Sequence, residues 1–553
     1  MATILCLKNE GYRWTERDNC HFKGYLQTEN GPVISGGNAI AFFNDLDSYD
    51  AFRNALKTHY GLFLVIVERG EEIWIGTDIA RSMPLYYTED LEYLSDDVDG
   101  ILERVPALRD AKDDFRMLEL YTSSFVGFSN TVFRHIKQLE LGCTARIRKG
   151  SVQQMPYYIH GGVSNRQSEN RIERLREATD HMIQRLLAAA AGRQIVLSLS
   201  GGYDSRYIAC SLKKRGVDDI ICYTYGRADS FEVAQSKKVA EALGYRWHNV
   251  TYDDESVRSI LANEGAYLDY ANRPDYIVYL QNYLAVKALH DGKLIPSDSV
   301  FITGLCNDMP TGYYIPTEEE AGSYGYSTEG LAEYNIAQRF VKFNLSQAAR
   351  DRFKTDVKQY LERMSVRVTD YQSFVGALDC LETANFHSRC YLNMNAVHGF
   401  FGYEWLLPCW DRELLDYWYA LKAEDRIGQK TYEEYITQHL ASQYGIGSRK
   451  HINASATSPS MRKLKRKIGA ILVKVAYPLG IPIRRNTDIN DMSVLEVELY
   501  KRIRQKKAIK PDRAALILLL TIYMMERRYG TDWYPMIKGY LDNIAAYKGR
   551  MIE

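Results

Sequence analysis

The hexapeptide Ser200-Gly-Gly-Tyr-Asp-Ser205 holds the residues of this chain whose types and spacing are best suited to chemistry. Its paired glycines let backbone N–H groups approach an anion closely. Ser200 and Ser205 can donate hydroxyl hydrogen bonds to phosphate oxygens, and Asp204 can hold a divalent cation that bridges phosphates. No lysine follows the second glycine, so the loop is not of the G-x-x-x-x-G-K-[ST] type. The hexapeptide predicts a phosphate-binding loop; a serine-glycine turn in an ordinary αβ unit is the alternative.

A second stretch, Ser299 to Gly312, combines an apolar segment with a glycine and one acid, Asp308. We expect the apolar segment to be a buried strand that runs into a glycine loop. Asp204 and Asp308, at the ends of two strands, would together hold Mg²⁺ on a pyrophosphate group. A surface Asn-Asp turn is the alternative for Asp308.

The elements that must position these loops follow a βαβαβ order. Apolar runs predict the strands, and apolar residues at helical spacing predict the helices. Gly216 and Gly244 follow two of the helices, at the position where glycine commonly ends them. The order predicts a doubly wound parallel sheet, with ligand bound beyond the carboxyl ends of its strands. In chain order the predicted elements are a helix at 167–191, a strand at 195–199, a helix at 206–215, a strand at 220–225, a helix at 231–243 and a strand at 245–250.

The hexapeptide resembles the pyrophosphate loop, SGGxDS, of N-type ATP pyrophosphatases, which cleave ATP between the α- and β-phosphates. The stretch from Gly304 to Asp308 is similar to the S-G-E-G-x-D-E segment of asparagine synthase-like enzymes, with Gly304 on the first glycine and Asp308 on the aspartate. Residues 404–411, EWLLPCWD, resemble the E-A-R-V-P-F-L-D motif of the same family. The resemblance implies that the chain uses ATP and Mg²⁺. The residues it implies are, for ATP and its pyrophosphate, Ser200, Gly201, Gly202, Asp204, Ser205 and Gly304, and, for Mg²⁺, Asp204 and Asp308.

Lys450 follows Lys430 by twenty residues and lies in a Gly-Ser-Arg-Lys sequence. Members of the family place a lysine at the end of the same interval, where it stabilises the adenylate and the tetrahedral intermediate. The resemblance therefore implies that Lys450 is catalytic, because a cation there would offset charge growing on the carbonyl oxygen and the phosphate. An exposed surface lysine is the alternative, and Arg449 is the next candidate for the role.

Residues 1 to about 160 carry short apolar segments separated by Gly, Asn and Asp, which predicts a β-rich domain. Residues 61–88, GLFLVIVERGEEIWIGTDIARSMPLYYT, resemble the core of the class II glutamine amidotransferase domain. That resemblance implies an Ntn-hydrolase-like αββα sandwich and, in the family, a glutaminase with an N-terminal cysteine nucleophile. The sequence begins Met1-Ala2-Thr3, and its nearest cysteine, Cys6, falls inside the first predicted strand. We expect that the domain keeps its fold and has lost the glutaminase.

Several positions depart from the asparagine-forming pattern. Leu305 and Cys306 replace the glutamate and the second glycine of the first motif. Leu406 stands in place of an arginine, and Asn395 stands in place of an aspartate. A site for a small amino acid needs such charges to pair with the zwitterion. Their loss favours another carboxylate substrate, such as a sugar acid, and the chain looks most like the branch encoded with bacterial surface-polysaccharide genes.

The expected function is ATP-dependent, AMP-forming amide synthesis. A carboxylate is adenylated, and ammonia or an amine, supplied for example by a separate glutaminase, then displaces AMP. Three alternatives remain: an asparagine synthase proper that hydrolyses glutamine, an intramolecular amide former of the β-lactam or lasso-peptide type, and a nucleotide-binding pseudoenzyme. ATP–pyrophosphate exchange would separate the pseudoenzyme from the enzymes.

The chain of 553 residues has a formal net charge of +0, so it has no overall field that would collect nucleic acid. Nine cysteines without a C-x-x-C pair, and no signal peptide, predict reduced thiols in a cytoplasmic protein. No apolar run reaches the roughly 18–20 residues that span a bilayer. The basic run at 462–467 could touch anionic lipid, but a solvated helix face is the commoner cause of such a run.

Together these observations predict an α/β protein of three regions. Residues 1–165 form the degenerate amidotransferase-like domain, an Ntn-hydrolase-like αββα sandwich. Residues 166–460 form the ATP pyrophosphatase domain with its doubly wound parallel sheet. Residues 461–553 form a basic helical extension, in which 514–525 is predicted to be a buried helix.

Overall fold

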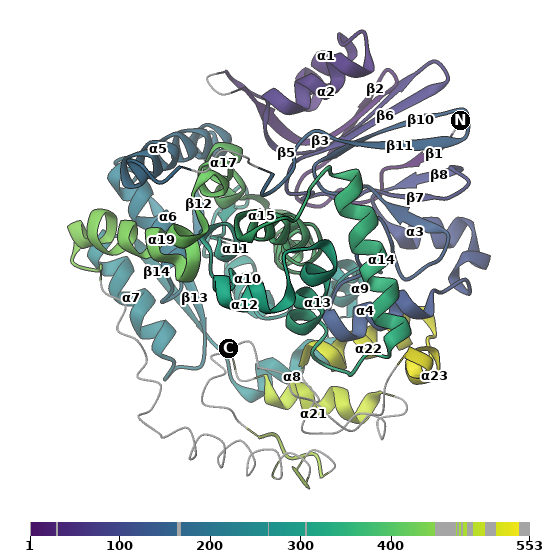
Figure 1. Ribbon diagram of the computed structural model, residues 1–553. Helices are drawn as coiled ribbons and strands as arrows, with labels where there is room; N and C mark the ends of the chain where they lie inside the picture. Colours follow the sequence, from purple (N-terminus) through teal and green to yellow (C-terminus); the bar gives the residue numbers. More distant parts are fainter. Residues whose placement is uncertain are drawn as a thin grey trace.

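The computed structural model of the chain describes residues 2–28, 31–162, 167–263, 265–304, 307–447, 472, 475–476, 479–483, 490, 492–503 and 516–540. The described part contains two stacked sheets from the first 156 residues and a separate parallel sheet from residues 195–406 (Figure 1). The predicted fold class, an αββα sandwich followed by a doubly wound parallel sheet, is confirmed.

The N-terminal sandwich is built from a seven-stranded and a four-stranded sheet. The seven strands are β2 (Trp14–Arg17), β3 (Cys20–Gln27), β4 (Val33–Ser35), β5 (Tyr60–Arg69), β6 (Glu72–Thr77), β10 (Cys143–Arg148) and β11 (Ser151–Pro156). The four strands are β1 (Thr3–Leu5), β7 (Tyr86–Thr88), β8 (Tyr93–Ser95) and β9 (Ile136–Gln138). The helices of the sandwich are α1 (Gly36–Asn44), α2 (Tyr49–Thr58), α3 (Val98–Arg104) and α4 (Asp114–Ser123).

The central strand β5 shows why the sandwich has four layers. Its side chains alternate between two faces, as the pleat of a strand requires. Leu62, Leu64 and Ile66 face the core that includes the four-stranded sheet. Phe63, Val65 and Val67 face the core formed with α1 and α2. Both faces are apolar because the strand lies between two layers.

The first strand is shorter than the sequence predicts. β1 ends at Leu5, so Cys6 lies just beyond the strand rather than inside it. Beyond β1 the backbone amides of Leu7 and Lys8 donate to the carboxylate of Asp96, and these bonds take the place of strand pairing.

The parallel sheet has the order β14-β13-β12-β15-β16. Its strands are β12 (Ile195–Ser198), β13 (Ile220–Gly226), β14 (Arg246–Thr251), β15 (Val300–Ile302) and β16 (Glu404–Leu406), and all neighbours are parallel. The chain adds β13 and β14 on one side of β12, and β15 and β16 on the other. The strand order therefore reverses between β12 and β15, and open α/β sheets bind ligands at such a switch point.

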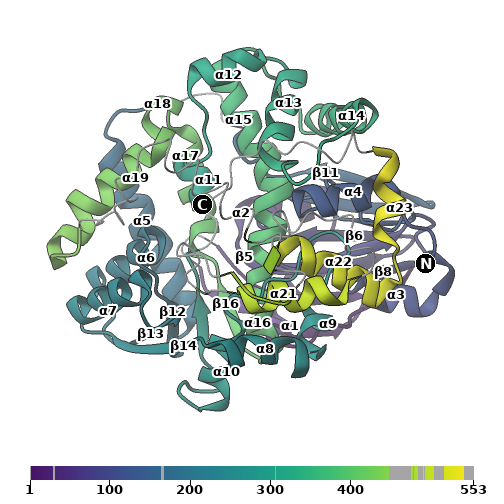
Figure 2. The same ribbon diagram turned by 90° about the horizontal axis from the view of Figure 1, so that it is seen from below.

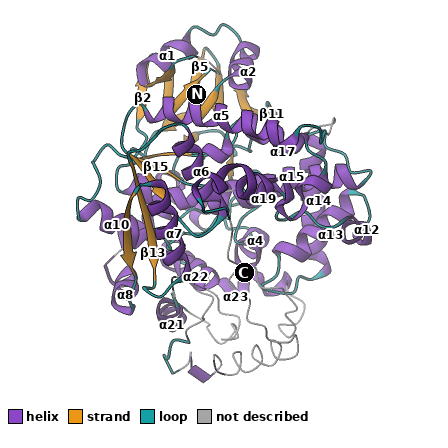
Figure 3. Cartoon of the chain, turned by 90° about the vertical axis from the view of Figure 1, so that its left-hand side faces the viewer, coloured by secondary structure: helices purple, strands orange, loops and turns teal. Residues whose placement is uncertain are grey.

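Helices cover both faces of the parallel sheet, so its strands are buried on both sides. Ile195 and Leu197 of β12 pack with α5 (Arg171–Ala190), α6 (Tyr203–Lys214) and α7 (Phe231–Leu243). Val196 belongs to the core on the other face, which includes α8 (Asp254–Asn263), α9 (Gly265–Ala271) and α10 (Tyr283–Asp291). The helix α7 ends at Gly244 with a φ of 70°, in the left-handed conformation that glycine adopts most readily. Figure 3 shows the sandwich strands above and the strands β13 and β15 below, flanked by α6 and α7.

The remaining helices pack around the sheet and beneath the sandwich. They are α11 (Asp308–Thr311), α12 (Glu318–Tyr324), α13 (Thr328–Arg339), α14 (Gln347–Arg363), α15 (Tyr371–Glu382), α16 (Ala396–Phe400), α17 (Arg412–Ala420), α18 (Ala423–Arg426), α19 (Lys430–Glu434), α21 (Ser493–Arg502), α22 (Leu516–Tyr529) and α23 (Trp533–Ile537). The buried helix predicted at 514–525 is confirmed as α22, which lies with α23 against α4 (Figure 2). Among the helices that the structure describes, none is both long enough and apolar enough to cross a membrane.

Candidate active site

The segment Ser200–Ser205, here called the glycine loop, joins β12 to α6 and folds onto itself. The Ser200 amide donates to Ser205 Oγ at 3.0 Å, and the two serine hydroxyl oxygens lie 3.0 Å apart. The Gly202 amide donates to Ser200 Oγ at 3.1 Å. The structure thus brings the two serines and the two glycines together, with Asp204 in the first turn of α6. The positive end of the dipole of α6 points into the loop, as a phosphate site requires.

One amide of the glycine loop already faces an anionic group. Gly201 N–H donates to Glu232 Oε2 at 3.0 Å, and Glu232 lies in the first turn of α7. A carboxylate oxygen in this position shows that the loop presents the amide outward, toward negative charge. Glu232 was not predicted from the sequence, although an acidic residue in the first turn of the next crossover helix could have indicated it.

The loop is also anchored from behind by Arg206, a fully buried arginine. Its Nη2 donates to the carbonyl of Gly201 at 3.1 Å, and its Nη1 donates to the carbonyl of Ile446 at 2.8 Å. Arg206 therefore ties the glycine loop to a segment 240 residues further along the chain. Arg206 was not predicted from the sequence either. The feature that could have indicated it is a basic residue directly after the hexapeptide, on the side of an amphipathic helix that faces the core.

Gly304 lies directly against Asp204. A Cβ at Gly304 would stand 2.9 Å from the carbonyl carbon of Asp204, closer than real Cβ atoms approach such an atom. The end of β15 can therefore pass over the first turn of α6 only because residue 304 has no side chain. β12 and β15 are neighbours, with Leu197 paired to Ile302, so both predicted loops leave the sheet at the switch point.

Asp308, predicted to lie in a glycine loop, begins the short helix α11. This helix is held by the buried guanidinium of Arg426, whose Nε donates to the Pro310 carbonyl at 2.8 Å. Arg426 is in turn paired through two hydrogen bonds, of 2.8 and 2.7 Å, with Asp379. Leu305 and Cys306, which precede the helix, lie outside the described residues.

Asp204 has a specific side-chain partner. The hydroxyl of Tyr432, in α19, donates to Asp204 Oδ1 at 2.8 Å. Burial, together with the neighbouring Asp204 carboxylate, raises the pKa of Tyr432 well above its ordinary value. Tyr432 therefore stays a neutral donor and orients the carboxylate of Asp204.

The residues of the motif at 404–411 have structural partners. Glu404 Oε2 accepts a hydrogen bond from Arg193 Nη1 at 2.6 Å. Asp411 forms a bidentate salt bridge with Arg185 of α5. Asn395 is buried and accepts from Thr303 Oγ1 at 3.5 Å. Because Thr303 directly precedes Gly304, this amide, not a carboxylate, stands beside the end of β15.

The residues present fit a magnesium-bound polyphosphate. Asp204 and Asp308 offer carboxylate oxygens, which are the ligands that Mg²⁺ prefers, and the glycine loop offers amides and hydroxyls to phosphate oxygens. Lys450, predicted to be catalytic, and Arg449 lie outside the described residues, as does the basic run at 462–467. The last described residue before Lys450 is Gly447, next to the tethered Ile446.

Residues 174–445 match the family model of asparagine synthase. The match places an asparagine synthase domain over the parallel sheet, the glycine loop, Gly304 and Asp308, so the family resemblance seen in the sequence is confirmed for this region. No curated protein matches the chain.

The chain is similar to two solved structures at low sequence identity and low TM-score. One is the NH3-dependent NAD synthetase from Campylobacter jejuni, with 15% identity, a TM-score of 0.20, and coverage of 39% of this chain and 94% of that chain. The other is the glutamine phosphoribosylpyrophosphate amidotransferase from B. subtilis, with 9% identity, a TM-score of 0.17, and coverage of 53% of this chain and 63% of that chain. At such TM-scores neither likeness carries an argument about this chain.

Proposed function

We propose that the chain is a carbon–nitrogen ligase that uses ATP to adenylate a carboxylate and then forms an amide, releasing AMP. The asparagine synthase domain at 174–445 supports ATP-dependent amide formation in general. The observation that carries the proposal is the glycine loop at the switch point of the parallel sheet, with Gly304 packed on Asp204.

The reaction has two steps. A carboxylate oxygen attacks the α-phosphorus of ATP, the bond from that phosphorus to the oxygen bridging to the β-phosphorus breaks, and pyrophosphate leaves. The nitrogen of ammonia or an amine then attacks the acyl carbon, the bond to the AMP oxygen breaks, and the nitrogen loses a proton. Adenylation is needed because a carboxylate is a poor electrophile, whereas AMP is a good leaving group.

The residues of the glycine loop and Asp308 have roles in the first step. Ser200, Gly201, Gly202 and Ser205 bind the departing pyrophosphate through amides and hydroxyls. Asp204, oriented by Tyr432, and Asp308, at the start of α11, would hold Mg²⁺, which would supply positive charge to offset that of the pyrophosphate.

Lys450 completes the proposal as the cation that stabilises charge growing on the acyl oxygen and the α-phosphate. Its support is the tether of Ile446 to Arg206, which fixes the chain beside the glycine loop four residues before Lys450.

The acceptor we propose is a sugar carboxylate, in the context of bacterial surface-polysaccharide synthesis in the cytoplasm. The support is the absence of charge at Asn395 and Leu406, since an α-amino acid substrate would require charged partners there. The Glu404 carboxylate forms a salt bridge with Arg193, so its charge is already balanced within the protein. The nitrogen donor is ammonia or an amine, from a separate glutaminase.

The proposal is tested by release of pyrophosphate from Mg-ATP in the presence of candidate sugar acids and an ammonium salt. Asp204→Ala should abolish acid-dependent release and leave the circular dichroism spectrum unchanged, because the substitution removes a metal ligand and little core volume. The matched control is Asp218→Ala, an exposed aspartate that pairs with Lys213 on the surface. Equal release by Asp204→Ala and wild type would overturn the assignment of the loop.

A further inference from the structure

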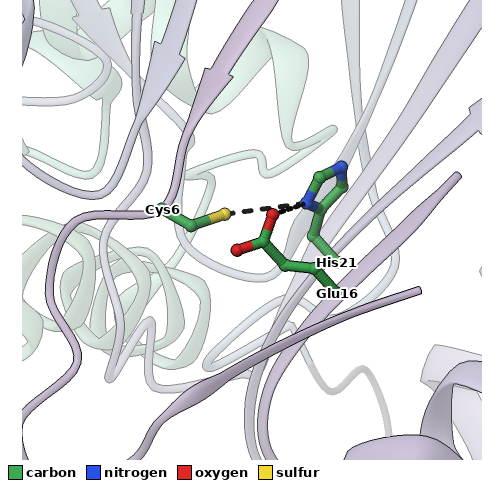
Figure 4. Close-up of side chains that lie close together, drawn as sticks. All are labelled: Cys6, Glu16 and His21. Carbon is green, nitrogen blue, oxygen red and sulfur yellow. Dashed lines mark hydrogen bonds and ion pairs between the residues drawn. The ribbon is translucent and has the colours of Figure 1, made fainter.

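Three side chains of the N-terminal sandwich form a group that the proposed function does not use. Cys6, Glu16 and His21 converge so that their ligand atoms all lie within 4.8 Å of one another (Figure 4). We call this group the Cys6 cluster. It lies at the end of β1 and on the β2–β3 hairpin, on elements other than those that carry the glycine loop.

The strand register explains why Glu16 and His21 meet. They are directly opposite each other in the antiparallel pair β2–β3, so their side chains emerge on the same face. The neighbouring residue Cys20 points to the opposite face and is buried in the core with α1 and α2. Cys6, just past the end of β1, then approaches the His21 ring from the adjoining sheet.

Two of the three separations within the Cys6 cluster match the edges of a coordination tetrahedron, and the third is below 4.8 Å. The Cys6 Sγ to His21 Nδ1 distance is 3.7 Å, and the His21 Nδ1 to Glu16 Oε2 distance is 3.1 Å. Zinc bonds of about 2.3 Å to sulfur and about 2.0–2.1 Å to nitrogen and oxygen, at tetrahedral angles, give about 3.6 Å for S···N and about 3.3 Å for N···O. A single ion can therefore reach all three atoms with small adjustments of rotamer.

The other nitrogen of His21 is also accounted for. Its Nε2 lies 3.5 Å from Glu68 Oε1, on β5. A carboxylate at the far nitrogen fixes the tautomer that leaves Nδ1 free to bind a metal, as in carboxylate–histidine–zinc arrangements. Glu16 is 55% exposed, whereas His21 is 16% exposed, so the cluster opens to solvent on the Glu16 side.

The thiol of Cys6 has surroundings that favour a cation. The carboxylates of Glu16 and Asp96 both act on it electrostatically, and a divalent ion beside them would offset their negative charge. Glu16 and Cys6 also face the same nitrogen of His21, a convergence that suits a shared ion better than a proton relay.

We propose that Cys6, Glu16 and His21 bind one zinc-class divalent ion, with a water molecule in the fourth, solvent-facing position. The donor set of one thiolate, one imidazole and one carboxylate selects a transition metal of the zinc class over Mg²⁺ or Ca²⁺. Thiolate and carboxylate together balance the two positive charges of the ion. The ion would join the segment directly after β1 of one sheet to β2 and β3 of the other.

The test uses metal-free full-length protein and Co²⁺ as a spectroscopic probe. One equivalent should give a thiolate-to-cobalt charge-transfer band and intense tetrahedral d–d bands. The charge-transfer band should vanish in Cys6→Ser. His21→Ala and Glu16→Gln should weaken binding by more than the roughly 10–100-fold loss expected for Glu68→Gln, which removes only the partner behind the histidine. The matched control is His135→Ala, which breaks a similar His–Glu pair that has no thiol beside it; its spectrum should equal that of wild type.

A second measurement needs no substitution. Cys6 is half-buried, while the other cysteines that the structure describes are buried, so among these cysteines native alkylation should reach Cys6 first. Zn²⁺ should slow that alkylation at least tenfold, and a chelator should restore it. An unchanged rate with Zn²⁺, or a cobalt spectrum without a thiolate band, would overturn the metal site. Rapid alkylation that depends on His21 and ignores Zn²⁺ would instead make Cys6 a nucleophile.

Discussion

Glu232 and a phosphate oxygen need the same donor, the Gly201 amide. In this structure the carboxylate holds it at 3.0 Å. ATP must displace Glu232 and also approach its negative charge. We therefore expect Glu232→Ala to bind ATP about tenfold more tightly, a change of about 1.4 kcal/mol, which is in the range of a charge-assisted hydrogen bond. Calorimetric titration with ATP measures the effect.

The control for this prediction is Glu241→Ala, which removes an exposed carboxylate of the same helix, α7. It should leave the affinity for ATP unchanged. Weaker binding of ATP by Glu232→Ala would contradict the competition and would assign Glu232 to holding the nucleotide or its metal ion.

At the scale of elements, the β12–α6 and β13–α7 units could be predicted because their signals are local. An apolar run before Ser200, and glycines at 216 and 244, mark the strand and the helix ends in the sequence itself. The anchors of the same site could not be predicted, because their partners are distant in sequence. Arg206 meets Ile446, and Arg426 meets Asp379, only after the chain has folded.

The pair of Arg426 and Asp379 supports the element that carries Asp308. Both side chains are fully buried, and Arg426 also donates to the Pro310 carbonyl of α11. Asp379→Ala leaves a buried guanidinium without its counter-charge, which typically costs about 3–5 kcal/mol. We expect a lower thermal midpoint and, because α11 loses its anchor, a raised KM for Mg-ATP in the variant that remains folded at low temperature.

Asp291→Ala serves as the comparison, since Asp291 forms an exposed i,i+4 pair with Lys287 on α10. Such pairs contribute little to stability. Equal thermal midpoints for the two variants would show that the Arg426–Asp379 pair does not support α11.

At the scale of the whole molecule, the three predicted regions share one core. Leu64 of the sandwich, Phe301 of the parallel sheet and Leu519 of α22 belong to the same cluster of buried side chains. Local patterns predict that each of these residues is buried, but they carry no information about which region packs on which. A polar group inside such a junction affects the stability of the entire chain.

His160 is a polar group at this junction, and it makes stability depend on pH. Its Nε2 donates to the Ile79 carbonyl at 2.9 Å, and its Nδ1 lies 3.0 Å from the hydroxyl of Tyr419, which donates to it. The neutral His160 ring therefore forms hydrogen bonds with both the Ile79 carbonyl and the Tyr419 hydroxyl. Burial lowers the pKa of His160 to about 4 from 6.5. Between these values the unfolded chain binds a proton that the folded chain does not, so stability falls as the pH falls from about 6.5 to about 4.

The shift of about 2.5 pH units corresponds to about 3 kcal/mol at the acid end of that window. His160→Gln keeps one donor for Ile79 and one acceptor for Tyr419 but cannot be protonated there. Urea denaturation at about pH 7 and about pH 4.5 should therefore show a smaller acid loss of stability in His160→Gln than in wild type. His387 and His398 are also buried, and they contribute equally to both proteins. His135→Gln, at an exposed position, should follow wild type. An equal loss of stability at low pH in wild type and in His160→Gln would contradict the prediction. It would mean that the folded protein accommodates the protonated His160 ring.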